Sequence, residues 1–430
     1  MNFSEAEAYL YSLGNEVETM KLGLENITTL LAALGEPQTK YKKVQVAGTN
    51  GKGSVCAFLD SICRTADIRT GLYTSPHLIS ITERIKIAGV EITEDEFARL
   101  ATSVRETAEA LLSDGRLEYR PTFFEQVTAI ALLAFGEAKI ELAILETGLG
   151  GRYDAVTAAK AEIAAITRID LDHQEYLGET IEEIAEEKAA IIREDSHVVI
   201  GPQSERVMDV ILERCGEVGA FLQSEDYGLW TVGSEPDGSV SVETYRYKYP
   251  GRLLGLLGEH QIENARIAVN IAQALEMNLG VEIEDTHAIG DGLENARHPG
   301  RLEYISNFLL DGAHNPGGAK ALRKFLDESE KRPITLIFGA MQNKAVGEIA
   351  GILWPRADKV ILTRPSNSRA MSVDELAAFA PEGIDFNKIV KIASVAEAME
   401  KAREVTPSDG VIVVTGSLYL VGEVKKLLNN

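Results

Sequence analysis

The chain has 430 residues, of which 45% are hydrophobic and 25% charged, and it carries a formal net charge of −23. This is the balance of a globular protein with two or three domains, and no apolar run approaches the roughly 18 residues of a membrane span. So large a negative charge also excludes a general nucleic-acid binder, because a phosphate backbone must be met by basic patches.

The cysteines and the first residues bear on the location of the protein. The three cysteines have neither a metal-ligand spacing nor the even count of a disulfide framework. The acidic start, MNFSEAEAYL, lacks the pattern of a signal peptide. We therefore expect a cytoplasmic protein with no membrane partner and no nucleic-acid partner. No unpaired apolar stripe stands out, which favours a monomer.

Strand-like apolar runs alternate with helical patterns, which predicts an α/β fold with a mostly parallel sheet. The expected strands of the first part are 44–46, 142–145 and 163–167, with a helix over 55–65 and antiparallel strands within 230–249. After residue 302 we expect strands over 305–310, 334–338, 359–362, 388–392 and 411–414, with helices over 318–328 and 373–379. Because Pro299 and Gly300 interrupt a helical pattern, we expect a domain boundary there, with a larger α/β domain over 1–297 and a smaller Rossmann-like α/β domain over 298–430.

The first motif, VQVAGTNGKGSV, places a glycine loop between a strand and a helix. Only two residues separate Gly48 from Gly51, whereas the common P-loop pattern has four before Gly-Lys-[Ser/Thr], and Gly53 intervenes before Ser54. Backbone N–H groups in such a loop can approach phosphate oxygens, with the helix dipole behind them. Lys52 can neutralise phosphate charge and Ser54 can bind Mg²⁺. The alternative is a simple strand-to-helix turn.

Glu146 ends the next apolar strand, and a glycine-rich loop follows it. An acid at the carboxyl end of a strand beside a phosphate loop is well placed to hold Mg²⁺. The alternative is an acid that merely opens a loop. Arg152 and Asp154 can hold substrate or form an ion pair within the loop. His173 follows the strand 163–167, and as a loop histidine it is either a ligand or a surface residue.

Lys188 is the least expected residue of the next helix. Thr180 and Glu183 form a capping-box pattern that predicts the start of this helix. Lys188 falls within its apolar stripe, where an unpaired cation costs several kcal/mol if buried. The side chain can snorkel to solvent, pair with a buried acid, or react with CO₂ to give an anionic carbamate, which a lowered amine pKa would favour.

Further candidates follow in the last third of the chain. Asn264 lies on a helix expected to begin near His260, where an asparagine can recognise adenine or simply face solvent. Asp311 and His314 lie at the carboxyl end of a predicted strand, the functional edge of an α/β sheet. Together with Arg301 they would make sense if the two domains closed over one nucleotide.

Several motifs occur together in one order: GTNGKGS, YTSPHL, TERIKI, PTFFE, ETGLGGR, LDH, EKA, HQ, PGRLE and DGAHNP. In this combination the chain resembles the folylpolyglutamate synthase/dihydrofolate synthase family of the Mur-ligase superfamily, over nearly its whole length. The resemblance implies an ATP-dependent ligase. A folate carboxylate attacks the γ-phosphate of ATP, and the amine of L-glutamate then displaces phosphate from the acyl phosphate. Lys52 and two Mg²⁺ ions would reduce the repulsion between the two anions.

The resemblance also implies roles for individual residues. ATP would be bound by Gly48, Thr49, Asn50, Gly51, Lys52, Gly53, Ser54, Asn264, Arg301 and Asp311. The Mg²⁺ ligands would be Ser54, Glu146, His173 and a CO₂-derived carbamate on Lys188. Folate or dihydropteroate would contact Ser75, Thr122, Phe123, Phe124, Glu125, Arg152, Tyr153, Asp154 and Ala155. L-Glutamate would contact His314 and Ser417, and the catalytic residues would be Lys52, Lys188, His314 and His77.

The sequence departs from the family pattern at 155–157, Arg168, Asp170, His298 and 341–346. The first and last departures concern the folate pocket and a loop of the second domain. One rival reading is a cell-wall Mur ligase, but only 47 residues precede Gly48, against about 100 for the extra N-terminal domain of those enzymes. The others are a phosphotransferase and a nucleotide switch. The sequence leaves open whether dihydropteroate, existing folates or both accept glutamate.

Overall fold

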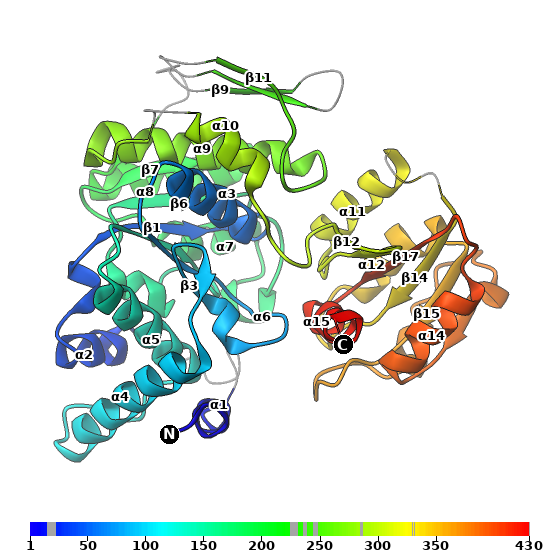
Figure 1. The fold of residues 1–430 in the computed structure, drawn as a ribbon, viewed down its shortest axis with the longest axis horizontal. Coiled ribbons are helices and arrows are strands. Elements are labelled where there is room, and N and C mark those ends of the chain that lie inside the picture. Colours follow the sequence, from blue (N-terminus) through cyan, green and yellow to red (C-terminus); the bar gives the residue numbers. More distant parts are fainter. Residues whose placement is uncertain are drawn as a thin grey trace. The chain divides into compact units, whose positions relative to one another are not determined.

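The computed structural model describes residues 1–14, 23–223, 231–234, 239–243, 248–283, 287–328, 330 and 332–429. These residues form two compact units (Figure 1). The first consists of Met1–Gly255 and Ile262–Arg297, and the second of Leu256–Gln261 and His298–Asn430. None of the described helices is long and apolar enough to cross a membrane.

An eight-stranded sheet with the order β4-β3-β2-β5-β1-β6-β7-β8 forms the centre of the first unit. From β2 to β8 its neighbouring strands are parallel, whereas β3 and β4 add an antiparallel edge. The strands are β1 Lys42–Ala47, β2 Thr70–Tyr73, β3 Ile85–Ile87, β4 Val90–Glu91, β5 Leu142–Glu146, β6 Ile163–Ile166, β7 His197–Ile200 and β8 Phe221–Leu222. The prediction of a mostly parallel sheet is confirmed.

Helices cover this sheet, and one buried apolar cluster joins side chains of α1, α2, α4 and α5 to it. A second cluster joins β6 and β7 to α7 and α8. The helices are α1 Phe3–Ser12, α2 Glu25–Ala33, α3 Lys52–Thr65, α4 Glu94–Ser113, α5 Phe123–Ala138, α6 Gln174–Leu177, α7 Ile181–Ala189, α8 Glu205–Val218, α9 His260–Leu279 and α10 Ala288–Asn295. The predicted start of α7 is confirmed, because Thr180 and Glu183 form its capping box.

A small antiparallel sheet of the first unit has the order β11-β10-β9 (Figure 1). Its strands are β9 Thr231–Ser234, β10 Val240–Glu243 and β11 Lys248–Arg252. The expected antiparallel strands are confirmed for these residues, while Trp230 and the segments 235–238 and 244–247 lie outside the described residues.

The second unit is built on a six-stranded sheet with the order β12-β13-β17-β14-β15-β16. From β13 to β16 the pairing is parallel, as in a Rossmann-like sheet. The strands are β12 Glu303–Ile305, β13 Phe308–Leu310, β14 Ile334–Phe338, β15 Lys359–Leu362, β16 Ile389–Lys391 and β17 Val411–Thr415. The helices are α11 Pro316–Glu328, α12 Val346–Leu353, α13 Val373–Ala377, α14 Val395–Val405 and α15 Leu418–Asn429.

One predicted strand is wrong. Residues 305–310 do not form a single strand, because β12 and β13 pair antiparallel as a hairpin. Ser306 has a φ of 57°, the left-handed conformation that a two-residue hairpin turn requires. The sequence shows only serine and asparagine at this turn, without the glycine that usually marks one.

The topology places three loops at one edge of the first sheet. Strands β5, β1 and β6 are adjacent and parallel, and their register pairs Val46 with Glu146 and Ala47 with Ile166. The loops that follow these strands therefore begin side by side. They contain the glycine motif, Glu146 and the segment that leads to His173. This is the edge at which open α/β sheets bind ligands.

Candidate functional site

The phosphate loop, Gly48–Ser54, joins β1 to α3 in a conformation that depends on two glycines. Gly48 has a φ of 150° and Gly51 a φ of 91°. A Cβ at Gly48 would collide with the hydroxyl of Thr167, and one at Gly51 with the carboxamide of Asn264. The structure therefore brings Asn264 of α9 against the loop, as the predicted nucleotide site requires.

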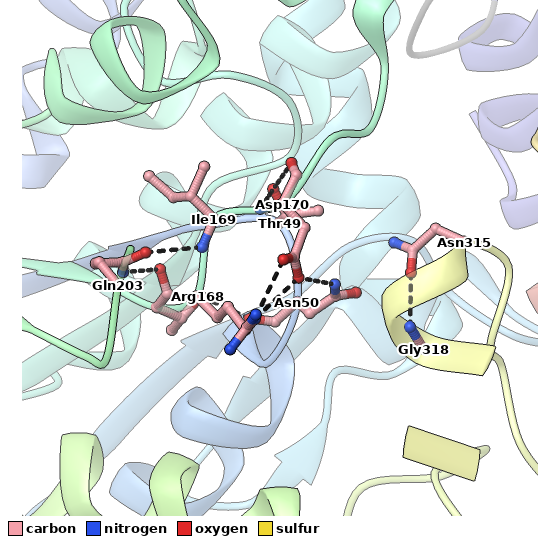
Figure 2. A network of polar contacts seen from close by, with 9 residues as sticks. Thr49, Asn50, Arg168, Ile169, Asp170, Gln203, Asn315 and Gly318 are labelled. Carbon is pink, nitrogen blue, oxygen red and sulfur yellow. Dashed lines mark hydrogen bonds and ion pairs between the residues drawn. The ribbon is translucent and has the colours of Figure 1, made fainter. Parts of the chain in front are cut away.

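A second loop, residues 167–170 after β6, supports the phosphate loop and is called the supporting loop below (Figure 2). The hydroxyl of Thr49 donates to the carbonyl of Asp170 at 2.9 Å and accepts from its amide at 3.1 Å. The carboxylate of Asp170 accepts from the carboxamide of Asn50 at 3.0 Å and from Nε of Arg168 at 3.1 Å. The hydroxyl of Thr167 donates to the carbonyl of Asn50 at 2.8 Å.

These contacts decide which amides can meet a phosphate. The amides of Thr49 and Asn50 donate to the carbonyl of Arg168 at 2.9 and 3.3 Å. While these bonds hold, neither amide is available to an anion. The first turn of α3, which begins at Lys52, leaves its amides without an intrahelical acceptor. An anion at this helix end also gains from the helix dipole.

Gln203 holds the supporting loop in turn. Its carboxamide oxygen accepts from the amide of Ile169 at 3.1 Å, and its nitrogen donates to the carbonyl of Thr167 at 2.8 Å (Figure 2). The loops after β1, β6 and β7 are thus joined by hydrogen bonds. The support from Thr167 and Gln203 was not predicted from the sequence, in which Arg168 and Asp170 stand out only as departures from the family pattern. No local spacing signals contacts between residues so far apart in the chain.

Two lysines meet at one carbonyl oxygen. Nζ of Lys52 donates to the carbonyl of Gly48 at 3.2 Å, and Nζ of Lys188 donates to the same oxygen at 3.0 Å. Lys188 is buried, with 5% of its surface exposed. Burial and, to a smaller extent, the charge of Lys52 lower the pKa of its amine to about 7, although Asp172 and Asp154 oppose the shift. The snorkelling alternative is excluded by this burial.

The buried acids are held by backbone amides. Glu146 is 6% exposed and accepts from the amide of Ser75 at 3.1 Å. Asp154 accepts from the amides of Leu149 and Val156, both at 2.9 Å. Burial raises the pKa of Asp154 to about 6, although these hydrogen bonds and the charge of Lys52 lower it. The loop after β5 therefore presents carboxylates near the two lysines.

His173 is the N-cap residue of α6 and has a left-handed φ of 54°. Its Nε2 lies 3.9 Å from a carboxylate oxygen of Asp172. Across the described residues, no three His, Cys, Asp or Glu side chains gather as a metal site. The predicted set differs in kind, since it combines one acid and one histidine with Ser54 and a modified Lys188. Its assignment stays a prediction.

His77 lies in a partly buried environment, next to Arg84, that keeps its ring neutral. Nε of Arg84 donates to Nδ1 of His77 at 2.8 Å, and the hydroxyl of Tyr11 lies 3.2 Å from Nε2. Burial and the charge of Arg84 lower the pKa of His77 to about 3. Because Nδ1 accepts from a guanidinium, the neutral ring carries its proton on Nε2. Here His77 is a hydrogen-bond donor rather than a group that titrates near neutral pH.

The residues expected in the folate pocket have structural partners of their own. Thr122 and Glu125 form the capping box of α5. Phe123 is 2% exposed and stacks on Tyr11, with ring centroids 5.7 Å apart. The ring of Phe124 lies where a Cβ on Gly148 would be, next to the loop after β5.

The other predicted folate residues belong to that loop. Nε of Arg152 donates to the carboxylate of Glu187 at 2.7 Å, so Arg152 forms an ion pair, although its partner lies in α7 rather than within the loop. Ala155 is buried, whereas Tyr153 is 39% exposed and borders a surface cavity of about 320 Å³. The cavity is lined by Leu149, Gly150, Gly151, Tyr153, Tyr176, Leu177, Gly178, Glu183, Glu186 and Glu187.

In the second unit, Asp311 follows β13 and is 8% exposed. Its carboxylate accepts from the amides of Leu302 at 3.1 Å and Ala313 at 3.0 Å. Burial raises its pKa, and the positive charge of Arg301 opposes this shift. The predicted pair of Arg301 and Asp311 is thus brought together within this unit.

His314 and Ser417 lie at the ends of the adjacent strands β13 and β17. Nδ1 of His314 lies 2.9 Å from the carbonyl of Gly312 and must donate to it, which fixes the tautomer of a neutral ring. Ser417 is buried, and its hydroxyl accepts from the amide of Tyr419 at 3.1 Å. The amide of Gly416 donates to the carbonyl of Ala313 at 3.0 Å, which joins the two strand ends.

Comparisons with known proteins match both parts of this architecture. Residues 46–272 match the Mur ligase middle domain, and residues 300–418 match the glutamate ligase domain of Mur ligases. Among solved structures, a Mycobacterium tuberculosis folylpolyglutamate synthase complexed with ADP superimposes with a TM-score of 0.89 at 30% identity, over 100% of this chain and 98% of that chain. A Yersinia pestis bifunctional folylpolyglutamate synthase/dihydrofolate synthase complexed with AMPPNP and Mn superimposes with a TM-score of 0.85 at 29% identity, over 100% and 98%.

Curated relatives match the chain along its length. A probable bifunctional folylpolyglutamate synthase/dihydropteroate synthase of Haloferax volcanii is 34% identical over 99% of this chain, but the chain spans only 50% of that relative's length. A dihydrofolate synthase/folylpolyglutamate synthase of Bacillus subtilis is 32% identical over 95% of both chains. The chain therefore belongs to the Mur ligase family and, within it, to the folylpolyglutamate and dihydrofolate synthases.

Proposed function

We propose that this protein is an ATP-dependent acid–amino-acid ligase that joins L-glutamate to a folate through an acyl phosphate. The observation that carries the proposal is the pair of lysines at the carbonyl of Gly48, beside a phosphate loop whose open amides lie at the start of α3. In a chain of net charge −23, Lys52 and these amides offer an anion a local positive site, and Lys188 supplies a buried amine beside it. The family and the ligands named for the solved relatives support the same reading.

The first step brings two anions together, because a folate carboxylate attacks the γ-phosphorus of ATP, whose bond to the bridging oxygen breaks to give an acyl phosphate and ADP. Lys52 and the first amides of α3 stabilise the negative charge on the phosphates. Asn264 lies against Gly51, where it can contact the nucleotide. In the second step the glutamate amine attacks the acyl phosphate, forms the amide bond and releases phosphate, while the ammonium proton goes to a base. We propose His314, whose Nδ1 donates to the carbonyl of Gly312, as that base.

A divalent metal fits the oxygen donors at the phosphate loop. The hydroxyl of Ser54 and the carboxylate of Glu146 are both buried and are hard ligands of the kind that Mg²⁺ prefers. Glu146 follows the strand that pairs with β1. When bound, Mg²⁺ would reduce the repulsion between the reacting anions. We propose Ser54, Glu146, His173 and modified Lys188 as its ligands.

We also propose that Lys188 carries a carbamate. Its neutral amine attacks CO₂, forms an N–C bond and loses one proton to water. The remaining N–H can still donate to the carbonyl of Gly48, and the new negative charge would attract Lys52 instead of repelling it. Nuclear magnetic resonance after exposure to isotope-labelled bicarbonate should show a carbamate signal in the wild type and none in Lys188→Arg. A wild-type spectrum without this signal would remove the assignment.

The acceptor is tested by a substrate panel. Purified protein should release phosphate from ATP only when Mg²⁺, L-glutamate and a folate acid are all present, with tetrahydrofolate and dihydropteroate tried separately. Dihydropteroate is a second candidate because the Bacillus subtilis relative is named for both activities. Phosphate release without glutamate would favour a phosphotransferase, and the absence of any amide product with either acid would reject the ligase.

A further inference from the structure

The loop that follows β15 lies at the carboxyl edge of the second sheet and is held at several points. The amide of Arg369 donates to the side-chain oxygen of Asn367 at 3.0 Å, and its carbonyl accepts from the amide of Gln342 at 2.9 Å. The next residue, Ala370, forms a bridge with Met341. The backbone of Arg369 is therefore held by Asn367 of its own loop and by Gln342 and Met341 of the loop after β14.

The side chain of Arg369 is partly exposed and carries an unmatched charge. Nη2 donates to the hydroxyl of Tyr419 at 3.3 Å, and the guanidinium lies 6.0 Å from the centre of that ring. Among the described residues, no carboxylate forms an ion pair with it. Glu423, an acid of the same helix as Tyr419, instead accepts from the amide and hydroxyl of Ser366 at 2.8 and 3.2 Å.

A chain of contacts connects Arg369 to the predicted glutamate residues. Tyr419, which contacts the guanidinium, donates its amide to the hydroxyl of Ser417. The neighbouring Gly416 bonds to Ala313, the residue before His314. These residues follow β17 and β13, which are adjacent in the sheet. Arg369 thus stands on the same strand edge, within the same unit, as the two residues expected to meet glutamate.

We propose that Arg369 binds a carboxylate of the incoming amino acid. The inference rests on the proposed ligase function and deepens it, because it names the group that selects an acidic amino acid. A guanidinium forms paired hydrogen bonds with a carboxylate. A fixed backbone and a tyrosine contact restrict the side chain before the ligand arrives, which reduces the entropy lost on binding. Arg301 is less suited to this role, because its charge acts on the buried Asp311.

Steady-state kinetics of Arg369→Gln test the proposal. Loss of the charged hydrogen bonds should raise KM for L-glutamate by about 10- to 100-fold, while KM for ATP stays within about twofold of the wild type. Arg364→Gln is the matched control: Arg364 is an exposed arginine of the same loop whose charge acts on Glu375. Arg369→Lys should recover part of the affinity, and Tyr419→Phe should raise KM only a few-fold.

Two analogues identify the carboxylate. If Arg369 binds the side-chain carboxylate, the wild-type preference for L-glutamate over L-glutamine should shrink in Arg369→Gln. If Arg369 binds the α-carboxylate, the wild-type preference for L-glutamate over the α-amide of L-glutamate should shrink in Arg369→Gln instead. An unchanged KM for L-glutamate in an Arg369→Gln variant that unfolds at the wild-type temperature would overturn the proposal. Should that variant not fold, unchanged KM values in both Arg369→Lys and Tyr419→Phe would overturn it. A wild type that makes no amide product would instead reject the ligase function.

Discussion

Replacing Lys188 by methionine separates function from stability. The lysine is 5% exposed, and its amine donates to the carbonyl of Gly48. After burial, the positive charge of Lys52 is the largest cause of its lowered pKa. No acid of the described residues forms an ion pair with it. Methionine has nearly the same length and no charge. We expect Lys188→Met to lose activity and to gain stability.

The magnitude follows from the pKa. A fall from 10.5 to about 7 corresponds to about 5 kcal/mol of cost for the buried ammonium form, at about 1.4 kcal/mol per pH unit. Methionine removes this cost and loses one hydrogen bond of about 1 kcal/mol. The carbonyl of Gly48 keeps Lys52 as a donor at 3.2 Å, so it is not left unpaired. The net gain should be up to about 4 kcal/mol, comparable with the upper end of the range of about 1–4 kcal/mol found when buried ion pairs are replaced by apolar groups.

Urea unfolding followed by circular dichroism, in buffer free of CO₂, measures the stability of both proteins. Phosphate release with ATP, Mg²⁺, a folate and L-glutamate measures activity, which should fall at least about a hundredfold in Lys188→Met, since a proposed ligand of the metal is lost. Bicarbonate should stabilise the wild type and leave the variant unchanged. A variant that unfolds at clearly lower urea than the wild type would refute the reasoning, because Lys188 would then be a net stabilising contact.

Three further predictions concern the same unit. Thr167→Val removes the hydrogen bond to the carbonyl of Asn50, worth about 1 kcal/mol, so KM for ATP should rise about fivefold; an unchanged KM would contradict the supporting role. Gly51→Ala forces a left-handed residue, at about 1–2 kcal/mol, and a clash with Asn264, so calorimetry should show at least about tenfold weaker ATP binding; wild-type affinity would count against it. The pKa of His77 is about 3 in the fold and 6.5 in the unfolded chain, so the unfolded chain binds the extra proton between these values and stability falls as pH drops from 6.5 to 3. The fall should be smaller in His77→Gln, and equal slopes would argue against the neutral ring.

The sequence predicted the parallel sheets and the edge at which the loops gather, because both follow from patterns along the chain. Alternating strands and helices require parallel pairing, and parallel strands end at one edge. This is why Gly48, Glu146 and His173 could be expected in neighbouring loops. The burial of Lys188 could also be expected, since the helical period places it in an apolar stripe, and the structure gives it 5% exposure.

Contacts between distant loops could not be predicted in this way. Gln203 and Thr167 carry no motif, and their importance comes only from lying beside the phosphate loop after folding. The capping box that Thr122 and Glu125 form in α5, by contrast, could have been predicted from the sequence. Their spacing is that of a capping box, as at Thr180, and only their membership in a family motif had suggested a ligand contact.

The supporting loop offers a physical account of the short spacing in the phosphate motif. In the common P-loop, residues between the first glycine and the lysine supply several amides to the phosphates. Here the amides of Thr49 and Asn50 are bound to the carbonyl of Arg168, so these residues position the loop rather than the ligand. The anion is left with the first turn of α3 and with Lys52. A shorter loop with fewer amides would bind phosphate more weakly, and the buried Lys188, in its proposed form as an anion that holds a metal, would restore the lost charge stabilisation.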